Sequence, residues 1–346
     1  MTRRIEISGP YFEDLHLGQR FDDAPSVTLT SGHAALHEAF FADRLRLPLD
    51  ATLSEAVTGR AAQLANPSLV CNVAIGQTTT PSQRVRGNLF YRGLVLQRPV
   101  FLGDTLRTTT TVVGLAQNKP KPGRPSTGMV ALEMLVKNQD GDTVLHFWRC
   151  PMLPCRDPAY SSSHADTFEA IPATLAMETL TEAVPKGWHL DLFRSRVPGE
   201  HFAEIEEGTT YVVEGRDTVT SAPELVRLTL NQAMTHTDAT TSAYKKRLVY
   251  GGHTISMGAS QISRALPNLV TILAWRSCDH TGPVFEGDLL RTEVTVTGKE
   301  ALALTGGLAA GLVELHAKVF AERGDQAPEV GKDISVLDWR LVGLMA

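Results

Sequence analysis

The residues best suited to chemistry gather in the second half of the chain. Asn231 and His236 lie five positions apart, and Gly251-Gly252 begins fifteen positions after His236. An imidazole transfers protons near neutral pH, and a carboxamide holds and orients water or a hydroxyl group. A Gly-Gly turn at the start of a helix exposes backbone N–H groups at the positive end of the helix dipole. The set therefore predicts proton transfer combined with stabilisation of a negatively charged oxygen.

An internal repeat divides the chain into two related halves. Residues 98–107 and 282–291 share seven of ten amino acids at an offset of 184 positions. A second set of matches, at an offset of 190, lies earlier in each half: Phe12, Gly18 and Phe21 against Phe202, Gly208 and Tyr211. Two sets of matches in the same order indicate a duplicated domain. At the 190 offset, Asn231 and His236 correspond to Phe41 and Arg46, so only the second half carries the pair.

Each half has the same expected order of elements. A Ser/Thr-capped helix and a second helix precede a series of strands with Gly-Asp turns. Residues 129–136 and 144–148 read as strands, and Asp140-Gly141 between them is a hairpin signal. Strands that follow helical segments predict an α+β fold with a largely antiparallel sheet. We expect domains at 1–157 and 200–346, joined by a Pro-, Ser-, Ala- and Thr-rich connector at 158–199 that is partly helical around 167–183.

Composition sets the class of protein. Of the 346 residues, 42% are apolar and 21% are charged, which is typical of a globular protein, and the net charge of -5 with no long basic run argues against nucleic-acid binding. The sequence contains no run of eighteen apolar residues, so we expect no transmembrane helix. The N-terminal residues lack the apolar stretch of a secretory signal, and four cysteines fit no zinc pattern, so we expect reduced thiols in a cytoplasmic protein. No phosphate-binding Gly-rich loop, HExxH or GxSxG motif supports redox-cofactor, metalloprotease or serine-hydrolase chemistry.

The second-half motif resembles the (R)-specific enoyl-CoA hydratases of the MaoC-like class. In that class an acidic residue is followed five positions later by His, and then by a Gly-containing turn that opens the long central helix; here Asn231 stands at the acidic position. The sequence is most similar to the mesaconyl-CoA hydratase family (2-methylfumaryl-CoA hydratase or β-methylmalyl-CoA dehydratase), which also carries Asn there. The matching segments span nearly the whole chain and include Tyr11-Phe12-Glu13-Asp14, Asn88-Leu89, Tyr91, Gly103-Asp104-Thr105-Leu106, Asp238-Ala239-Thr240, Tyr250-Gly251-Gly252-His253 and His280.

This resemblance implies a double hot-dog fold, in which each half wraps an antiparallel sheet around a central helix. It also implies reversible hydration of a 2-enoyl-CoA thioester, with mesaconyl-CoA and β-methylmalyl-CoA as the expected pair and no cofactor beyond the CoA of the substrate. Hydration requires a base for water, an acid for the α-carbon and a donor at the thioester oxygen. We expect His236 to transfer the protons, Asn231 to hold the water, and a backbone N–H near Gly251 or Gly252 to stabilise the oxygen. The first half would cover the acyl and pantetheine groups.

Several further residues are candidates for substrate binding. Asp238 is expected to orient the imidazole of His236, and Tyr250 precedes the glycines of the resembled motif. His253 and His280 either line the pocket or make structural hydrogen bonds. The remaining candidates are cationic.

Lys245 and Arg247 belong to a short basic run that either contacts the CoA phosphates or forms a solvated loop. Arg46 is a candidate partner for the carboxylate of a dicarboxylic acyl group. His33 and His37 have a helical spacing that metal ligands use, but no third ligand is evident, and we expect no metal.

Three other functions remain open. The alternatives are a hydratase for another branched enoyl-CoA, a hot-dog acyl-CoA thioesterase, and a non-catalytic acyl-CoA-binding protein. No nucleic-acid or membrane partner is expected. Hot-dog proteins usually assemble by pairing sheets, and a double hot-dog chain already contains one such pair. Both a monomer and a homodimer are therefore compatible with the sequence.

Overall fold

The computed structural model describes residues 3–302, 309–323 and 333–346. The first half and the connector form η1 (Phe12–Asp14), β1 (Arg20–Phe21), β2 (Val27–Thr28), α1 (Ser31–Phe41), α2 (Arg46–Leu49), α3 (Ala51–Thr58), α4 (Pro67–Gly76), η2 (Thr80–Ser82), β3 (Gly87–Leu96), β4 (Thr105–Gln117), β5 (Thr127–Lys137), β6 (Thr143–Pro154), α5 (Met177–Glu182) and α6 (Leu190–Arg196). The second half forms β7 (Thr210–Val212), β8 (Asp217–Thr218), α7 (Ala222–Leu228), α8 (Met234–Thr237), α9 (Gly251–Ala265), β9 (Leu269–Asp279), β10 (Leu289–Ala301), β11 (Gly311–Glu322) and β12 (Asp333–Met345).

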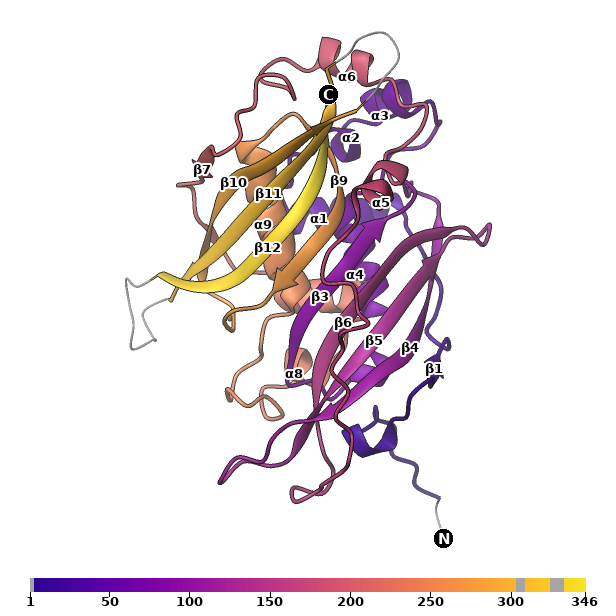
Figure 1. Ribbon diagram of the computed structural model, residues 1–346, viewed down its shortest axis with the longest axis vertical. Coiled ribbons are helices and arrows are strands. Elements are labelled where there is room, and N and C mark those ends of the chain that lie inside the picture. The colour runs from indigo at the N-terminus through magenta and orange to yellow at the C-terminus, as the bar shows by residue number, and fades with distance from the viewer. Residues whose placement is uncertain (1–2, 303–308, 324–332) are drawn as a thin grey trace.

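One antiparallel sheet runs through both halves (Figure 1). Its strand order is β1-β4-β5-β6-β3-β9-β12-β11-β10-β7, with β2 beside β4 and β8 beside β10. The order is symmetric about the junction of β3 with β9, where Tyr91 pairs with Cys278 and Val95 with Ala274. The α+β prediction and the double hot-dog expectation are confirmed, because each half repeats the same strand order on either side of that junction.

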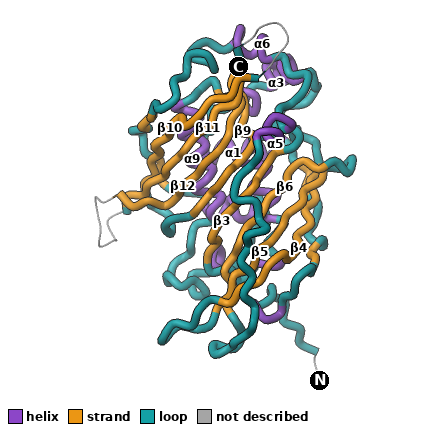
Figure 2. The backbone as a smooth tube through the Cα atoms, viewed as in Figure 1, coloured by secondary structure: helices purple, strands orange, loops and turns teal. Residues whose placement is uncertain are grey.

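The two central helices, α4 and α9, lie together on one face of the sheet (labelled in Figure 1; the same face carries the purple helices behind the strands in Figure 2). Helix α4 begins at Pro67, whose fixed φ suits the first turn, and the Asn66 side chain accepts a hydrogen bond from the Ser68 N–H. Helix α9 is buried along most of its length and is rich in Gly, Ser and Ala, which permits close packing. Asn72 Nδ2 of α4 donates to Ser256 Oγ of α9 at 2.8 Å. These positions are 184 apart, so equivalent residues of the two halves meet at this contact.

Equivalent polar contacts fix each central helix to its own half of the sheet. Gln77 Nε2 donates to the Leu106 carbonyl at 2.8 Å, and Gln261 Nε2 donates to the Leu290 carbonyl at 3.0 Å. Gln77 is related to Gln261, and Leu106 to Leu290, by the 184-residue offset. The repeat read from the sequence therefore extends to hydrogen bonds made by buried side chains.

The repeated Gly-Asp turns are also equivalent. The carboxylates of Asp104 and Asp288 each accept a 2.8 Å hydrogen bond from a backbone N–H three residues earlier. Gly103 and Gly287 precede them with φ values of 101° and 89°, which a residue with a side chain rarely adopts. The turn chemistry explains why these residues recur in both copies.

The hairpin predicted around Asp140-Gly141 is confirmed. Strands β5 and β6 pair across it, and Gly141 has a φ of 82°. The side-chain oxygen of Asn138 accepts hydrogen bonds from the N–H groups of Asp140 and Asp142. An Asx-type turn therefore stabilises the loop.

The connector crosses the face of the sheet opposite the two central helices (Figure 1). Within 167–183, the expected helix is confined to Met177–Glu182. Phe168 and Ile171 precede this helix and pack with Phe90 and Trp148 on the outer face of the first-half sheet. Apolar packing holds this stretch in place without regular secondary structure. Among the described residues, no helix is long and apolar enough to cross a membrane.

Candidate active site

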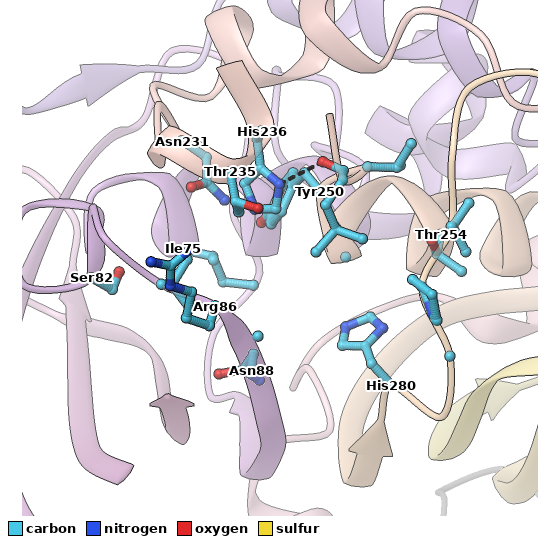
Figure 3. A pocket seen from close by; sticks show the side chains of 18 of the residues that line it. Ile75, Ser82, Arg86, Asn88, Asn231, Thr235, His236, Tyr250, Thr254 and His280 are labelled. Carbon is cyan, nitrogen blue, oxygen red and sulfur yellow. Dashed lines mark hydrogen bonds between the residues drawn. The ribbon is translucent and has the colours of Figure 1, made fainter. Parts of the chain in front are cut away.

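A cavity of about 280 Å³ lies between the two halves, at the N-terminal end of α9. The first half contributes Ile75, Tyr91 and Arg149, among others, and the second half contributes Asn231, His236 and His280. Figure 3 shows Asn231 and His236 on one side of this cavity and His280 on the other. Neither half alone forms the cavity, since residues of both are required to enclose it.

Asn231 is placed by an unusual backbone turn. Leu230, after the end of α7, has a φ of 60°, a left-handed conformation that costs a residue with a side chain roughly 1–2 kcal/mol. This turn is followed by Asn231, which is 7% exposed, at the cavity wall. Its Oδ1 lies 3.2 Å from the Thr79 hydroxyl, which is within hydrogen-bond reach. Gly76 faces this turn, and a Cβ there would overlap the Thr229 carbonyl. Strain at Leu230 is consistent with a functional position.

His236 is held as a neutral imidazole with one nitrogen available. Its Nδ1 lies 2.7 Å from the Leu248 carbonyl oxygen, which requires a proton on Nδ1 (Figure 3). Nε2 therefore carries the lone pair of the neutral ring. Burial lowers the pKa of His236 to about 4; the charge of Arg149 acts in the same direction, while the hydrogen bond to Leu248 opposes it. At neutral pH His236 is thus able to accept a proton.

The two glycines at the start of α9 have different surroundings. Gly251 lines the cavity, and a Cβ there would overlap the imidazole of His280. Gly252 lies behind it, where a Cβ would overlap Asn72 Oδ1 and the ring of Tyr250. The first N–H groups of a helix have no acceptor within the helix. The Gly251 N–H is therefore the better placed donor for a substrate oxygen.

Tyr250 and His280 complete the wall around this helix end. Both line the cavity; His280 Nε2 is buried without a hydrogen-bond partner among the described residues, and the Tyr250 hydroxyl makes no hydrogen bond of good geometry there, although it lies close enough to the Asn231 side chain to interact with it. Burial raises the pKa of Tyr250 well above its ordinary value and lowers that of His280 to about 4. Both groups are consequently neutral at pH 7. They are free to hydrogen-bond a ligand.

Asp238 does not orient His236, which corrects the expectation from sequence. Its carboxylate accepts hydrogen bonds from the N–H and hydroxyl of Thr240, both at 2.8 Å. The Nδ1 of His236 is already bound to a backbone carbonyl. A carboxylate two residues along the chain is therefore not needed to hold the ring.

His253 lies outside the cavity and makes a structural hydrogen bond, which is the second of the two roles expected for it. Its Nε2 is 2.6 Å from the Thr220 carbonyl, and its ring packs against Phe41. His37 also packs against Phe41, with ring centroids 4.9 Å apart, whereas His33 hydrogen-bonds with Thr30 at the start of α1. Among the described residues, no group of three or more His, Cys, Asp or Glu is arranged to hold a metal ion.

Arg46 does not face the cavity, which corrects its proposed role in binding a carboxylate. It starts α2, and its Nε donates to the Pro267 carbonyl at 3.2 Å, beyond the C-terminal end of α9. The 190-residue offset relates Arg46 to His236 by repeat position. Repeat-related residues occupy equivalent places in the two halves, and these places lie at opposite ends of α9.

The basic run borders an open hollow next to the cavity. Lys245 and Arg247 line this hollow together with Lys246 and Glu286. Arg247 forms an ion pair with Glu286 at 2.5 Å, while Lys245 and Lys246 are exposed. The neighbouring residues Tyr244 and Leu248 line the cavity itself. The basic run thus lies at the border between the cavity wall and the open hollow.

Sequence reasoning missed Arg149, a cation buried in the cavity wall. It lies in β6 between Trp148 and Cys150 and is 5% exposed. The available signal was one arginine within an otherwise mainly apolar strand. Long charged residues are rarely fully buried unless they are paired or functional.

A second, much smaller cavity occupies the equivalent place in the first half. Eight residues that line it match eight residues of the larger cavity at the 184 offset, including Pro67 for Gly251 and Leu96 for His280. Its volume is about 30 Å³, and Trp188 of the connector forms part of its wall. Proline has no N–H to donate. The first half therefore lacks both the space and the helix-end donor of the second half.

No family model matches the sequence. The chain is 46% identical to a solved conserved hypothetical protein with a double hot-dog fold from Mycobacterium tuberculosis, covering 99% of this chain and 100% of that one with a TM-score of 0.87. A putative MaoC domain dehydratase from Chloroflexus aurantiacus matches with 26% identity, 97% coverage of both chains and a TM-score of 0.80. Mesaconyl-CoA hydratase from Cereibacter sphaeroides is 29% identical over 86% of each chain. The chain therefore belongs to the MaoC-like hydratases and dehydratases that have a double hot-dog fold.

Proposed function

We propose that this protein reversibly hydrates a 2-enoyl-CoA thioester, with mesaconyl-CoA as substrate and β-methylmalyl-CoA as product. The observation that carries the proposal is the convergence of Asn231, His236 and the Gly251 end of α9 on one cavity. The name of the Cereibacter sphaeroides relative supports this acyl group. Dehydration of the product would use the same residues in reverse.

The reaction needs one base, one water site and one oxyanion donor. The side chain of Asn231 and Nε2 of His236 hold the water, and His236 takes one of its protons. The water oxygen then bonds to the β-carbon, and the π electrons move through the α-carbon to the thioester oxygen. The Gly251 N–H and the positive end of α9 stabilise that oxygen. The imidazolium of His236 returns its proton to the α-carbon, which restores the thioester and adds one water in total.

The low pKa of His236 suits this cycle. A neutral imidazole accepts a proton from water, and its imidazolium, with a pKa of about 4, is a strong acid toward the α-carbon. Asn231 cannot act as a base, so it leaves both proton transfers to the histidine. Substitution of His236 should therefore cost more activity than substitution of Asn231.

The CoA portion would extend from the cavity toward the basic hollow. Lys245 and Lys246 are exposed there and are the proposed partners of the CoA phosphates, while Arg247 is paired with Glu286. Phosphate oxygens accept charge-assisted hydrogen bonds from such cations. The first half covers the acyl group through residues such as Ile75 and Tyr91.

A panel of enoyl-CoA and 3-hydroxyacyl-CoA thioesters, including mesaconyl-CoA, tests the proposal. Loss of enoyl absorbance reports hydration, and a thiol reagent reports free CoA in the same reaction. We expect hydration without thiol release. Thiol release from either kind of thioester would instead identify a thioesterase, and tight binding without turnover would identify a binding protein.

Two variants test the assignment of residues. Asn231→Ala and His236→Ala should each lower kcat, by about 10-fold or more and about 100-fold or more respectively. The matched control is His253→Ala, which removes a buried histidine outside the cavity. Full turnover by both site variants would show that the site has been misassigned.

A further inference from the structure

Arg149 is a buried cation that has no counter-ion among the residues that the structure describes. Its side chain lines the cavity from the middle of β6 and is almost completely shielded from solvent. No salt bridge between described residues involves it. Removing a guanidinium from water costs several kcal/mol unless an anion or several hydrogen bonds compensate. A site that retains such a charge is suited to an anionic ligand.

The guanidinium is held by one of its nitrogens. Arg149 Nη2 donates to the Thr78 carbonyl at 2.9 Å and lies 2.6 Å from the hydroxyls of Thr78 and Ser82. Nε is buried without a partner, and none of the described hydrogen bonds uses Nη1. All three acceptors of Nη2 are neutral. The group is thus oriented by the protein and still has N–H groups to donate.

The fold does not require arginine at this place. In the first half Tyr91 of β3 pairs with Arg149 of β6, and in the second half Trp275 of β9 pairs with Leu341 of β12. Tyr91 and Trp275 are related by the 184-residue offset, so Leu341 is the structural counterpart of Arg149. Leu341 is buried in the apolar core. An apolar residue therefore serves at the equivalent position of the second half, so the sheet itself does not require a cation there.

Arg149 is close to the reacting groups. It binds Thr78, and the next residue, Thr79, is within hydrogen-bond reach of Asn231. Its charge is also near enough to His236 to lower the pKa of that imidazole. In mesaconyl-CoA the free carboxylate is attached directly to the β-carbon. Water held by Asn231 and His236 attacks that same carbon, so the carboxylate must lie one bond away from the point of attack.

We propose that Arg149 binds the free carboxylate of a dicarboxylic 2-enoyl-CoA and thereby selects this substrate class over neutral enoyl-CoAs. The inference rests on the proposed hydratase function and replaces Arg46 with a residue inside the cavity. Guanidinium groups bind carboxylates with directional, often bidentate, hydrogen bonds. The bound carboxylate would also neutralise the buried charge.

The test compares two substrates that differ only at the group in question. Mesaconyl-CoA carries a carboxylate where 2-methylbut-2-enoyl-CoA carries a methyl group. For each protein the ratio of kcat/KM for the acid to kcat/KM for the neutral substrate is measured. Arg149→Met should lower this ratio by ~100-fold, since loss of one partner of a buried charge pair costs several kcal/mol. Arg149→Lys should give an intermediate ratio, because lysine keeps the positive charge but lacks the planar guanidinium that can donate two parallel hydrogen bonds to a carboxylate.

The control is Arg86→Met, which removes a second arginine from the same cavity wall. Arg86 donates to the Thr241 carbonyl, and its removal should leave the substrate ratio unchanged. An unchanged ratio in Arg149→Met, or an equal fall in Arg86→Met, would overturn the inference. If Arg149→Met does not fold, Arg149→Gln and Arg149→Lys provide the same comparison.

A binding measurement separates this inference from the hydratase proposal. Methylsuccinyl-CoA and 2-methylbutanoyl-CoA are saturated, so neither is hydrated, and titration calorimetry gives a Kd for each. The wild-type protein should prefer the dicarboxylic thioester by at least 10-fold, and Arg149→Met should abolish the preference. If enoyl-CoAs are not hydrated but this preference is found, the hydratase proposal fails while the carboxylate-binding role of Arg149 stands. Equal Kd values in the wild type would remove the inference even if neutral enoyl-CoAs are hydrated.

Discussion

The Nδ1 of His236 lies 2.7 Å from the carbonyl oxygen of Leu248. This contact fixes the tautomer and leaves Nε2 as the basic nitrogen at the cavity. The substitution His236→Gln keeps a polar side chain but removes the base, so kcat for hydration should fall by ~100- to 10,000-fold. Steady-state assays that follow the enoyl absorbance measure this change. His253→Gln alters a histidine bound to Thr220 and should stay close to wild-type activity.

The pH dependence of hydration should report the lowered pKa of His236. The neutral ring is the active base, and burial lowers its pKa from 6.5 to about 4. Activity should therefore be retained between pH 7 and pH 5 and should decline only as the pH approaches 4. The measurement is kcat/KM against pH in buffers of constant ionic strength. An acid limb centred near 6.5 would mean that His236 titrates as a solvated imidazole.

Acid should destabilise the fold through its buried histidines. Burial lowers the pKa of His37 to about 3 and those of His236, His253 and His280 to about 4, whereas unfolded histidine titrates near 6.5. Between these pH values the unfolded chain binds more protons than the folded chain. The contribution of these histidines to the free energy of unfolding is therefore fully present above pH 6.5 and is lost as the pH falls toward 4. Urea unfolding at pH 7.5, 6, 5 and 4.5 measures this trend.

A variant identifies the histidine contribution to that trend. His253→Asn removes one titrating group, so the slope of the unfolding free energy against pH should decrease by about 1.4 kcal/mol per pH unit near pH 5. The slope is the informative quantity, because the variant also changes stability at neutral pH. An unaltered slope would assign the acid sensitivity to other groups.

Gly251 should tolerate no side chain while His280 is present. A Cβ at position 251 would overlap the His280 imidazole, so Gly251→Ala must displace either that ring or the start of α9. We expect a loss of ~100-fold in kcat, since one misplaced oxyanion donor has an effect of that size. The double variant Gly251→Ala/His280→Ala removes the overlap and should recover thermal stability relative to Gly251→Ala. Recovery of the melting temperature in the double variant is measured by circular dichroism.

The sequence was sufficient to predict the duplicated fold because the residues around the Gly-Asp turns recur in both halves. The Gly-Asp turns at Gly103 and Gly287 need positive φ values, and the helix that starts at Gly251 packs too closely for larger residues. Such local requirements act on residue type and remain visible in one chain. His236 was recognisable for the same reason, since its spacing from Gly251 belongs to a known motif.

The remaining site residues depend on how distant segments meet. Arg149 reaches the cavity only because β6 pairs with β3 beside the second-half loop, and no local pattern encodes that approach. Arg46 is the candidate partner for a substrate carboxylate, but the fold places it at the far end of α9. Asp238 was assigned by its closeness in sequence to His236, yet a backbone carbonyl had already taken the contact.

The pairing of β3 with β9 within one chain has a thermodynamic consequence for the cavity. Two separate subunits joined through such an edge dissociate on dilution, because their association depends on concentration. Here the covalent connection between β6 and β7 holds each half at a high effective concentration around the other. A site built from both halves therefore remains assembled at concentrations far below those that a two-subunit version would require.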